Sequence, residues 1–165
     1  MGIFVGIAVD PKPFELLLKG FGDSAVSPKE LHLTVAHYGN QYDLDDVVSA
    51  AERVAAMTRE FPLTYGGIGR FHHVTWIGVG VSYPGSTLLK LREKLMHELP
   101  AGDARRKFVP HVTVANQRIA DSMVCDMPRI AVTVQVDAIT VFDWSADSRQ
   151  AVASCRLRPV EKGLF

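Results

Sequence analysis

The sequence predicts an α+β protein organised around a β-strand motif that occurs twice. The pattern is His-Leu-Thr-Val at residues 32–35 and His-Val-Thr-Val at residues 111–114, and each copy has a proline shortly before its histidine. Polar and apolar side chains alternate in both copies, which is typical of a strand with one buried face. The rest of the chain intersperses further strand-like segments with three helix-like ones, which together indicate an α+β class.

The first half of the chain predicts four strands and two helices. Pro11 and Pro13 predict a helix that ends near residue 20, because proline is tolerated in a first helical turn. The acidic run at residues 43–46 predicts the start of a helix that ends near Arg59, since carboxylates stabilise helix N-termini. β-branched or alternating residues predict strands over 2–9, 31–36, 62–71 and 73–81.

The second half predicts one helix and four strands. Ser86 or Thr87 is a suitable N-cap for a helix that ends near Leu99, where a Pro-Ala-Gly sequence follows. Each half then has a motif strand, an intervening segment and two long strands, which suggests an internal duplication. The strands expected in this half are residues 111–115, 129–136, 138–144 and 150–158.

The repeated motif carries the chemistry. On a strand, His32 and Thr34 share one face, as do His111 and Thr113. If the two faces meet, two imidazoles and two hydroxyls converge on one space. They supply an acid, a base and two neutral hydrogen-bond donors, which suit an anionic phosphodiester.

These motifs resemble those of the 2H phosphoesterase superfamily, which includes the RNA 2′,3′-cyclic phosphodiesterases, also called 2′-5′ RNA ligase-like proteins. The matching segments are residues 4–9, 31–39, 68–71, 73–79 and 108–115. Two departures are His37-Tyr38-Gly39, where an aromatic-Leu-Gly sequence is common, and Asn116, where an arginine is common. The resemblance implies one bilobal domain over residues 1–165, with two antiparallel sheets, helices outside and a pseudo-two-fold axis at a central cleft.

The resemblance also implies a metal-independent phosphodiesterase without a cofactor. Its substrate would be a small nucleotide: a 2′,3′-cyclic phosphate, a 2′-5′ linkage or a cyclic oligonucleotide. One histidine would act as the base and the other as the acid, while Thr34 and Thr113 would bind phosphoryl oxygens; the sequence leaves open which histidine is which. The alternative is a non-catalytic module that binds a nucleotide or an RNA end in the same cleft.

Composition narrows the class of partner. A chain of 165 residues is long enough for one domain, and 18 basic residues balance 18 acidic ones. A protein that grips long duplex nucleic acid usually has a basic excess, so a small anionic substrate or an RNA end is favoured. No apolar run of membrane-spanning length and no signal peptide is evident, so we expect a cytoplasmic monomer with no membrane partner.

Other residues are candidates for substrate contact. Tyr38, Phe108 and Trp144 are aromatic side chains suited to stacking on a base, and Arg106 belongs to a basic cluster just before the second motif. Trp76 is expected in the core. His37 lies five residues after His32, so a regular strand would point the two in opposite directions. The sequence shows no motif with metal-ligand spacing.

Overall fold

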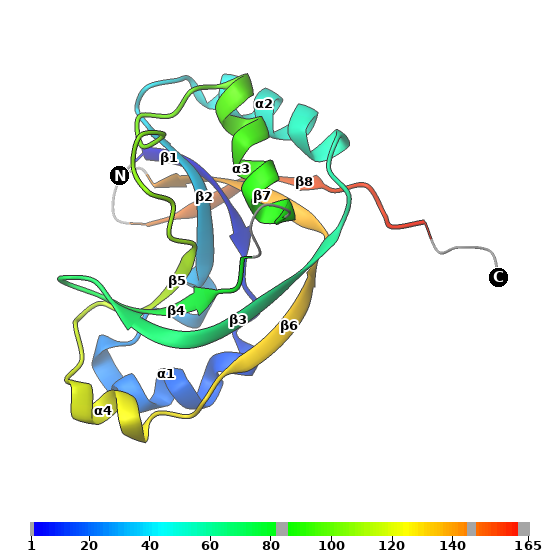
Figure 1. Ribbon diagram of the computed structural model, residues 1–165. Coiled ribbons are helices and arrows are strands. Elements are labelled where there is room, and N and C mark those ends of the chain that lie inside the picture. Colours follow the sequence, from blue (N-terminus) through cyan, green and yellow to red (C-terminus); the bar gives the residue numbers. More distant parts are fainter. Residues whose placement is uncertain (1, 82–85, 145–147, 162–165) are drawn as a thin grey trace.

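The computed structural model describes residues 2–81, 86–144 and 148–161, and one strongly curled antiparallel sheet runs through these ranges (Figure 1). Its eight strands are β1 (Gly2–Ala8), β2 (His32–Gly39), β3 (Phe61–Arg70), β4 (Thr75–Val79), β5 (His111–Ala115), β6 (Ala131–Val136), β7 (Ala138–Trp144) and β8 (Gln150–Arg156). The α-helices are α1 (Glu15–Phe21), α2 (Leu44–Ala56), α3 (Thr87–Glu98) and α4 (Asp121–Asp126), and short 3-10 helices cover Lys12–Phe14, Gly22–Ser24 and Pro28–Glu30.

The two motif strands, β2 and β5, are neighbours at the centre of the sheet. The strand order is β6-β3-β4-β5-β2-β1-β7-β8, so four strands lie on each side of the β2–β5 junction. A single register pair, Leu33 with Val112, joins the two strands there. The expectation of two separate sheets is therefore wrong: the backbone pairing continues across the junction and makes one sheet. The internal duplication stays a prediction.

The face of the junction that carries no histidine is buried. Leu33, Val35, Val112 and Val114 are fully buried and belong to the main hydrophobic core. Helices α2 and α3 pack together over strands β1, β2, β7 and β8, while α1 contacts β5 (Figure 1). Burial of these apolar side chains fixes which face of each motif strand points inward, so the His and Thr side chains lie on the opposite face.

The expected elements agree well with the structure. All eight strands and the three longer helices occur where the sequence predicts them, and β5 matches at both ends. Helix α4 was not predicted, because it has only six residues and its Ser, Val, Cys and Asp are weak helix formers. Among the described residues, no helix is both long and apolar enough to span a bilayer.

A glycine on β1 allows the close approach of the first motif strand. A Cβ atom built on Gly6 would lie 2.5 Å from the backbone carbonyl oxygen of Leu33. We expect Gly6→Ala to lower the free energy of unfolding by about 1–3 kcal/mol, because overpacking against backbone forces the strands apart. Gly80→Ala is the control, since its Cβ would meet its nearest neighbour at 3.7 Å. Equal losses in urea denaturation of the two variants would contradict this reading.

Candidate active site

The β2–β5 junction brings the four motif side chains into one group. Continued by one residue each way, the antiparallel register at Leu33–Val112 sets His32 opposite Thr113 and Thr34 opposite His111. The two histidines then occupy diagonal corners, a separation of roughly 7–8 Å between diagonal neighbours on adjacent strands. Among the described residues, the hydroxyls of Thr34 and Thr113 have no hydrogen-bond partner, so both are free to donate to a bound group.

Each motif is followed by a β-bulge at the same position. The register of β2 against β1 shifts between Val5 and Gly6, and that of β5 against β4 shifts between Thr75 and Trp76. Each shift reflects one extra residue in the motif strand after its threonine. As a result, the alanine two positions after each threonine, Ala36 or Ala115, is fully buried instead of facing the histidine side.

The bulge corrects the expectation for His37. In a regular strand its side chain would point away from His32. The extra residue restores it to the same face, where it lines a hollow with Thr34 and stacks on Phe4 at 6.4 Å between ring centroids.

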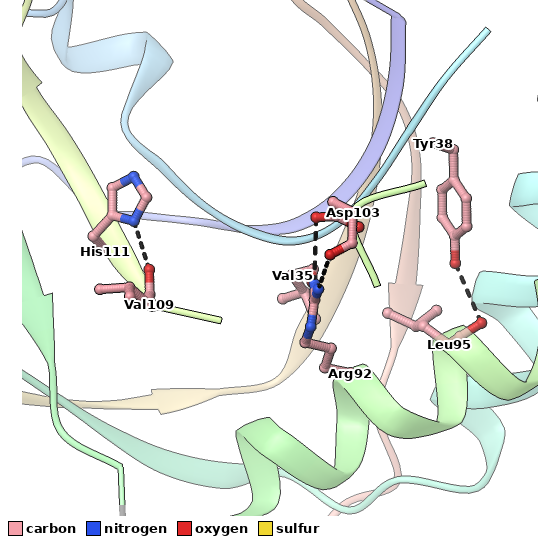
Figure 2. A network of polar contacts seen from close by, with 7 residues as sticks. All are labelled: Val35, Tyr38, Arg92, Leu95, Asp103, Val109 and His111. Carbon is pink, nitrogen blue, oxygen red and sulfur yellow. Dashed lines mark hydrogen bonds and ion pairs between the residues drawn. The ribbon is translucent and has the colours of Figure 1, made fainter. Parts of the chain in front are cut away.

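Both imidazoles are oriented by the same local hydrogen bond. Nδ1 of His32 lies 2.7 Å from the carbonyl oxygen of Glu30, and Nδ1 of His111 lies 2.7 Å from the carbonyl oxygen of Val109 (Figure 2 shows the second). A carbonyl only accepts, so a hydrogen bond there is donated by Nδ1–H. That arrangement leaves Nε2 as the nitrogen that gains or loses a proton.

Aromatic rings hold each imidazole from the side. His32 packs against Phe4 and Phe142, with centroid separations of 5.0 and 5.8 Å. His111 packs against Phe71 and Trp76, at 4.9 and 5.7 Å. Trp76 is half-buried rather than in the core as expected, and it forms part of the surroundings of His111.

The motif chemistry predicts one cavity between the two imidazoles, and this prediction is wrong: His111 and His32 line two different hollows. The first, called here the His111 hollow, has a volume of about 540 Å³ and is lined by His111 and Thr34. The second, the His32 hollow, has a volume of about 340 Å³ and is lined by His32 and Thr113. Each hollow thus contains the histidine of one motif and the threonine of the other, as the diagonal arrangement requires.

The His111 hollow has a basic wall. Arg92, which is almost fully buried, donates to the carbonyl oxygen of Val35 at the bulge and forms a 3.6 Å ion pair with Asp103 (Figure 2). Its guanidinium carbon lies 4.5 Å from the ring centroid of Phe108. Arg106 also lines this hollow. The Arg92 side chain therefore ties the bulge to the loop after α3, and Arg106 leaves a cation facing the hollow.

Burial and a guanidinium keep His32 uncharged. Nη1 of Arg149 contacts both Nδ1 of His32 and the carbonyl oxygen of Glu30. The pKa of His32 is lowered to about 4, chiefly by burial, with further lowering by the charges of Arg149 and His111 against an opposing effect of the Glu30 carbonyl. The imidazole of His32 is thus neutral at physiological pH, and it is close enough to His111 to sense its charge.

The structure separates the four predicted contact residues. Phe108 and Arg106 line the His111 hollow, and Trp144, which is 42% exposed, lines the His32 hollow. Tyr38 is 3% exposed, and its hydroxyl donates to the carbonyl oxygen of Leu95 (Figure 2). Tyr38 lies in neither hollow, because the bulge that turns His37 toward the site turns its neighbour into the core. Its assignment as a contact residue is therefore not retained.

Several residues at the site were not identified from the sequence. Arg92, Arg149, Phe4, Phe71 and Phe142 all contact motif residues or line the hollows. Arg149 is 117 positions away from His32 along the chain, so no local pattern connects them. The signal for the bulges was present: two consecutive apolar residues, Val-Ala, break the alternation after each threonine.

Metal-ligating side chains do not gather in the part of the chain that the structure describes. No group of three or more His, Cys, Asp or Glu side chains there is placed to hold a metal ion. His72 and His73 lie with their ring centroids 4.5 Å apart, and this pair forms no such group.

A curled antiparallel sheet whose two central strands each present a His-x-Thr pair defines a 2H phosphoesterase type of site. A family model described as the 2′-5′ RNA ligase superfamily matches residues 9–148. The chain belongs to this superfamily.

The chain is also similar to individual proteins. The RNA 2′,3′-cyclic phosphodiesterase of Thermotoga maritima is 29% identical over 142 residues, which cover 78% of this chain and 74% of that protein. A crystal structure from Thermus thermophilus has a TM-score of 0.77 at 17% identity and covers 96% of this chain and 99% of its own. Escherichia coli LigT in complex with 3′-AMP has a TM-score of 0.72 at 20% identity and covers 94% and 97%, respectively. Both structures share the fold.

The low pKa of His32 predicts a pH-dependent stability. An unfolded histidine titrates near 6.5, whereas folded His32 titrates at about 4, so the unfolded chain binds the extra proton first as the pH falls. The contribution of His32 to stability is complete above the unfolded pKa and is lost as the pH falls from about 6.5 toward 4.

We therefore expect His32→Gln to reduce the pH dependence of the free energy of unfolding in that interval, measured by urea denaturation. His97→Gln, at an exposed position on α3, should have the same pH dependence of the free energy of unfolding as the wild-type protein. If His32→Gln and the wild-type protein lost stability in parallel on acidification, His32 would not be the group responsible.

Proposed function

We propose that the protein is a phosphodiesterase that hydrolyses a small nucleotide by general acid-base catalysis with His32 and His111. The observation that carries this proposal is the diagonal arrangement at the β2–β5 junction, where each histidine faces the threonine of the other motif. The relative from Thermotoga maritima, an RNA 2′,3′-cyclic phosphodiesterase, supports the same reaction class.

The neutral state of His32 assigns the roles of the two histidines. Its Nε2 accepts a proton from water or a ribose hydroxyl as the new O–P bond forms. His111 takes the complementary role of the acid, which gives a proton to the leaving oxygen as the old P–O bond breaks. The hydroxyls of Thr34 and Thr113 donate to the non-bridging oxygens, where charge develops. Solvent then removes the proton from His32 and restores the one on His111.

The charge distribution suits a small anion. The chain has no net charge, yet Arg106, Lys107 and Arg149 line the two hollows. These cations favour a phosphodiester locally without the wide basic surface that long duplex nucleic acid requires. The candidate substrates are a 2′,3′-cyclic phosphate, a 2′-5′-linked nucleotide, a cyclic oligonucleotide or an RNA end.

Aromatic side chains in both hollows are suited to the nucleosides. Phe108 lines the His111 hollow and Trp144 lines the His32 hollow, and each offers a ring to a base. Arg106 is placed to contact a phosphate. All four motif residues come from one chain, so a monomer suffices for activity.

The proposal is tested by incubating the protein with a panel of 2′,3′-cyclic nucleotides, 2′-5′-linked dinucleotides and cyclic oligonucleotides, with separation of the products. Release of a phosphomonoester from one class identifies both the activity and the linkage. Tight binding of a panel member without turnover would instead establish a non-catalytic binding module.

Removal of either histidine should abolish most of the activity. A positioned acid or base contributes about 10²–10⁴-fold, so we expect His32→Ala and His111→Ala each to reduce kcat/KM by that order. Thr34→Ala and Thr113→Ala should reduce kcat/KM by a smaller factor, because each removes one hydrogen bond rather than a proton-transfer group.

Matched controls separate this effect from general damage. His97→Ala on α3 and Thr133→Ala on β6 change the same residue types at exposed positions away from both hollows. A folded His32→Ala or His111→Ala protein with the kcat of the control would overturn the assignment.

Activity should survive chelation. The proposed steps use two imidazoles, two hydroxyls and arginine side chains, and none requires a Lewis acid. We expect the same rate on the preferred substrate before and after dialysis against EDTA. Loss of turnover in EDTA that one added divalent ion restores would reject the metal-independent mechanism.

A further inference from the structure

One arginine distinguishes two otherwise matched half-sites. Both have the same motif, bulge, backbone-bonded imidazole and aromatic neighbours. Among the described residues, only the His32 half-site has a guanidinium against Nδ1 of its histidine, and Arg149 supplies it. This difference bears on how two similar histidines take different roles.

Arg149 is held by backbone and aromatic partners. Nη2 donates to the carbonyl oxygen of Lys29 at 2.9 Å, and Nη1 donates to that of Glu30. The guanidinium carbon lies 4.8 Å from the ring centroid of Phe142, which also packs against His32. Arg149 directly precedes β8, and the pairing of Gln150 with Asp143 on β7 fixes where that strand begins. Its charge is thus anchored beside His32.

We propose that Arg149 is a positioning residue that fixes His32 as the proton acceptor and so sets the direction in which the phosphodiester is cleaved. The proposal rests on the function proposed above. The guanidinium cannot accept a proton, and it contacts His32 at Nδ1, whose own hydrogen is donated to the Glu30 carbonyl. It therefore acts on the ring through its charge and not as a hydrogen-bond donor to Nδ1. It leaves Nε2 free to accept a proton while opposing a second charge on the ring.

The charged groups around His32 are consistent with this role. Arg149 faces it from the start of β8 and His111 from β5, and both charges oppose protonation of His32. The Glu30 side chain lines the same hollow and interacts with Arg149. The neighbours from β1 and β7, Phe4 and Phe142, are uncharged.

A direction of cleavage follows. With His32 as the base, the attacking oxygen approaches from the His32 hollow, beside Thr113 and Trp144. The leaving oxygen then departs on the side of His111, where Arg106 and Lys107 line the hollow. The part of the substrate that leaves as the alcohol therefore occupies the basic hollow.

The test compares Arg149→Met with Arg156→Met, which changes an exposed arginine at the far end of β8 whose ion pair with Asp137 spans 4.0 Å. The imidazole of His32 is titrated by NMR in each free protein, and kcat/KM on the preferred substrate is followed from about pH 4 to pH 9. In the wild-type protein, kcat/KM should be bell-shaped, with its acidic limb near the pKa of His32, about 4.

In Arg149→Met, the titration of His32 should move upward, toward the ordinary value of about 6.5, and the acidic limb should move with it. A limb that moves up by about one pH unit lowers activity at about pH 5, relative to the maximum, by about twofold, while Arg156→Met keeps the wild-type profile. Arg149→Gln should give the same shift. It is the substitute if Arg149→Met unfolds, because its amide can still donate to a backbone carbonyl.

An unchanged His32 titration in the folded variants would overturn the proposal. So would a uniform loss of activity with an unchanged pH profile, which is the signature of a merely structural role. The NMR titration needs no substrate. If no panel member is cleaved, the proposed function fails, and the titration still decides whether Arg149 controls His32.

Discussion

The pairing of Leu33 with Val112 is the contact on which the rest of the site depends. It is the single register pair between β2 and β5, and both side chains are fully buried. Their burial beneath the junction forces the flanking residues, a histidine and a threonine on each strand, to the other face. One hydrophobic pair in the core thus brings two distant segments of the chain together and sets four polar side chains on one face of the sheet, where they line the two hollows.

The bulges change which side chains face the site, and Arg92 satisfies a backbone carbonyl at one of them. A regular strand would turn His37 into the core, and the extra residue at the β2 bulge prevents this. A bulge also disturbs the ladder of backbone hydrogen bonds, and the buried Arg92 donates to the carbonyl oxygen of Val35 at that position. The same guanidinium pairs with Asp103, so its charge is partly balanced within the protein. The shape of the His111 hollow therefore depends on a helix that contributes no motif residue.

Much of the fold and the centre of the site could be predicted from the sequence, because both depend on local periodicity. Alternation located the strands, and the repeat located His32, Thr34, His111 and Thr113. The errors came from features that periodicity does not describe. His37 was placed by counting along a regular strand, and the bulge changed the count. Tyr38 was chosen as an aromatic side chain near a strand end, and the same bulge turns it into the core. Trp76 was expected in the core, but its neighbour on the adjacent strand β5 is the polar imidazole of His111. Arg149 reaches His32 through the β7–β8 pairing, which only the tertiary structure shows.

The backbone hydrogen bond that orients each histidine has a consequence for the origin of such a site. The bond from Nδ1 reaches a carbonyl only two residues earlier, so the orientation of each imidazole is determined by the sequence around its own strand. Each motif strand can therefore orient its histidine without help from the other strand. When two such strands pair in antiparallel fashion, the local two-fold relation directs one imidazole into each of the two hollows. Displacement at phosphorus needs one group behind the entering oxygen and another behind the departing one. Two strands with the same His-x-Thr motif supply both groups, and neither strand needs a different sequence motif to do so.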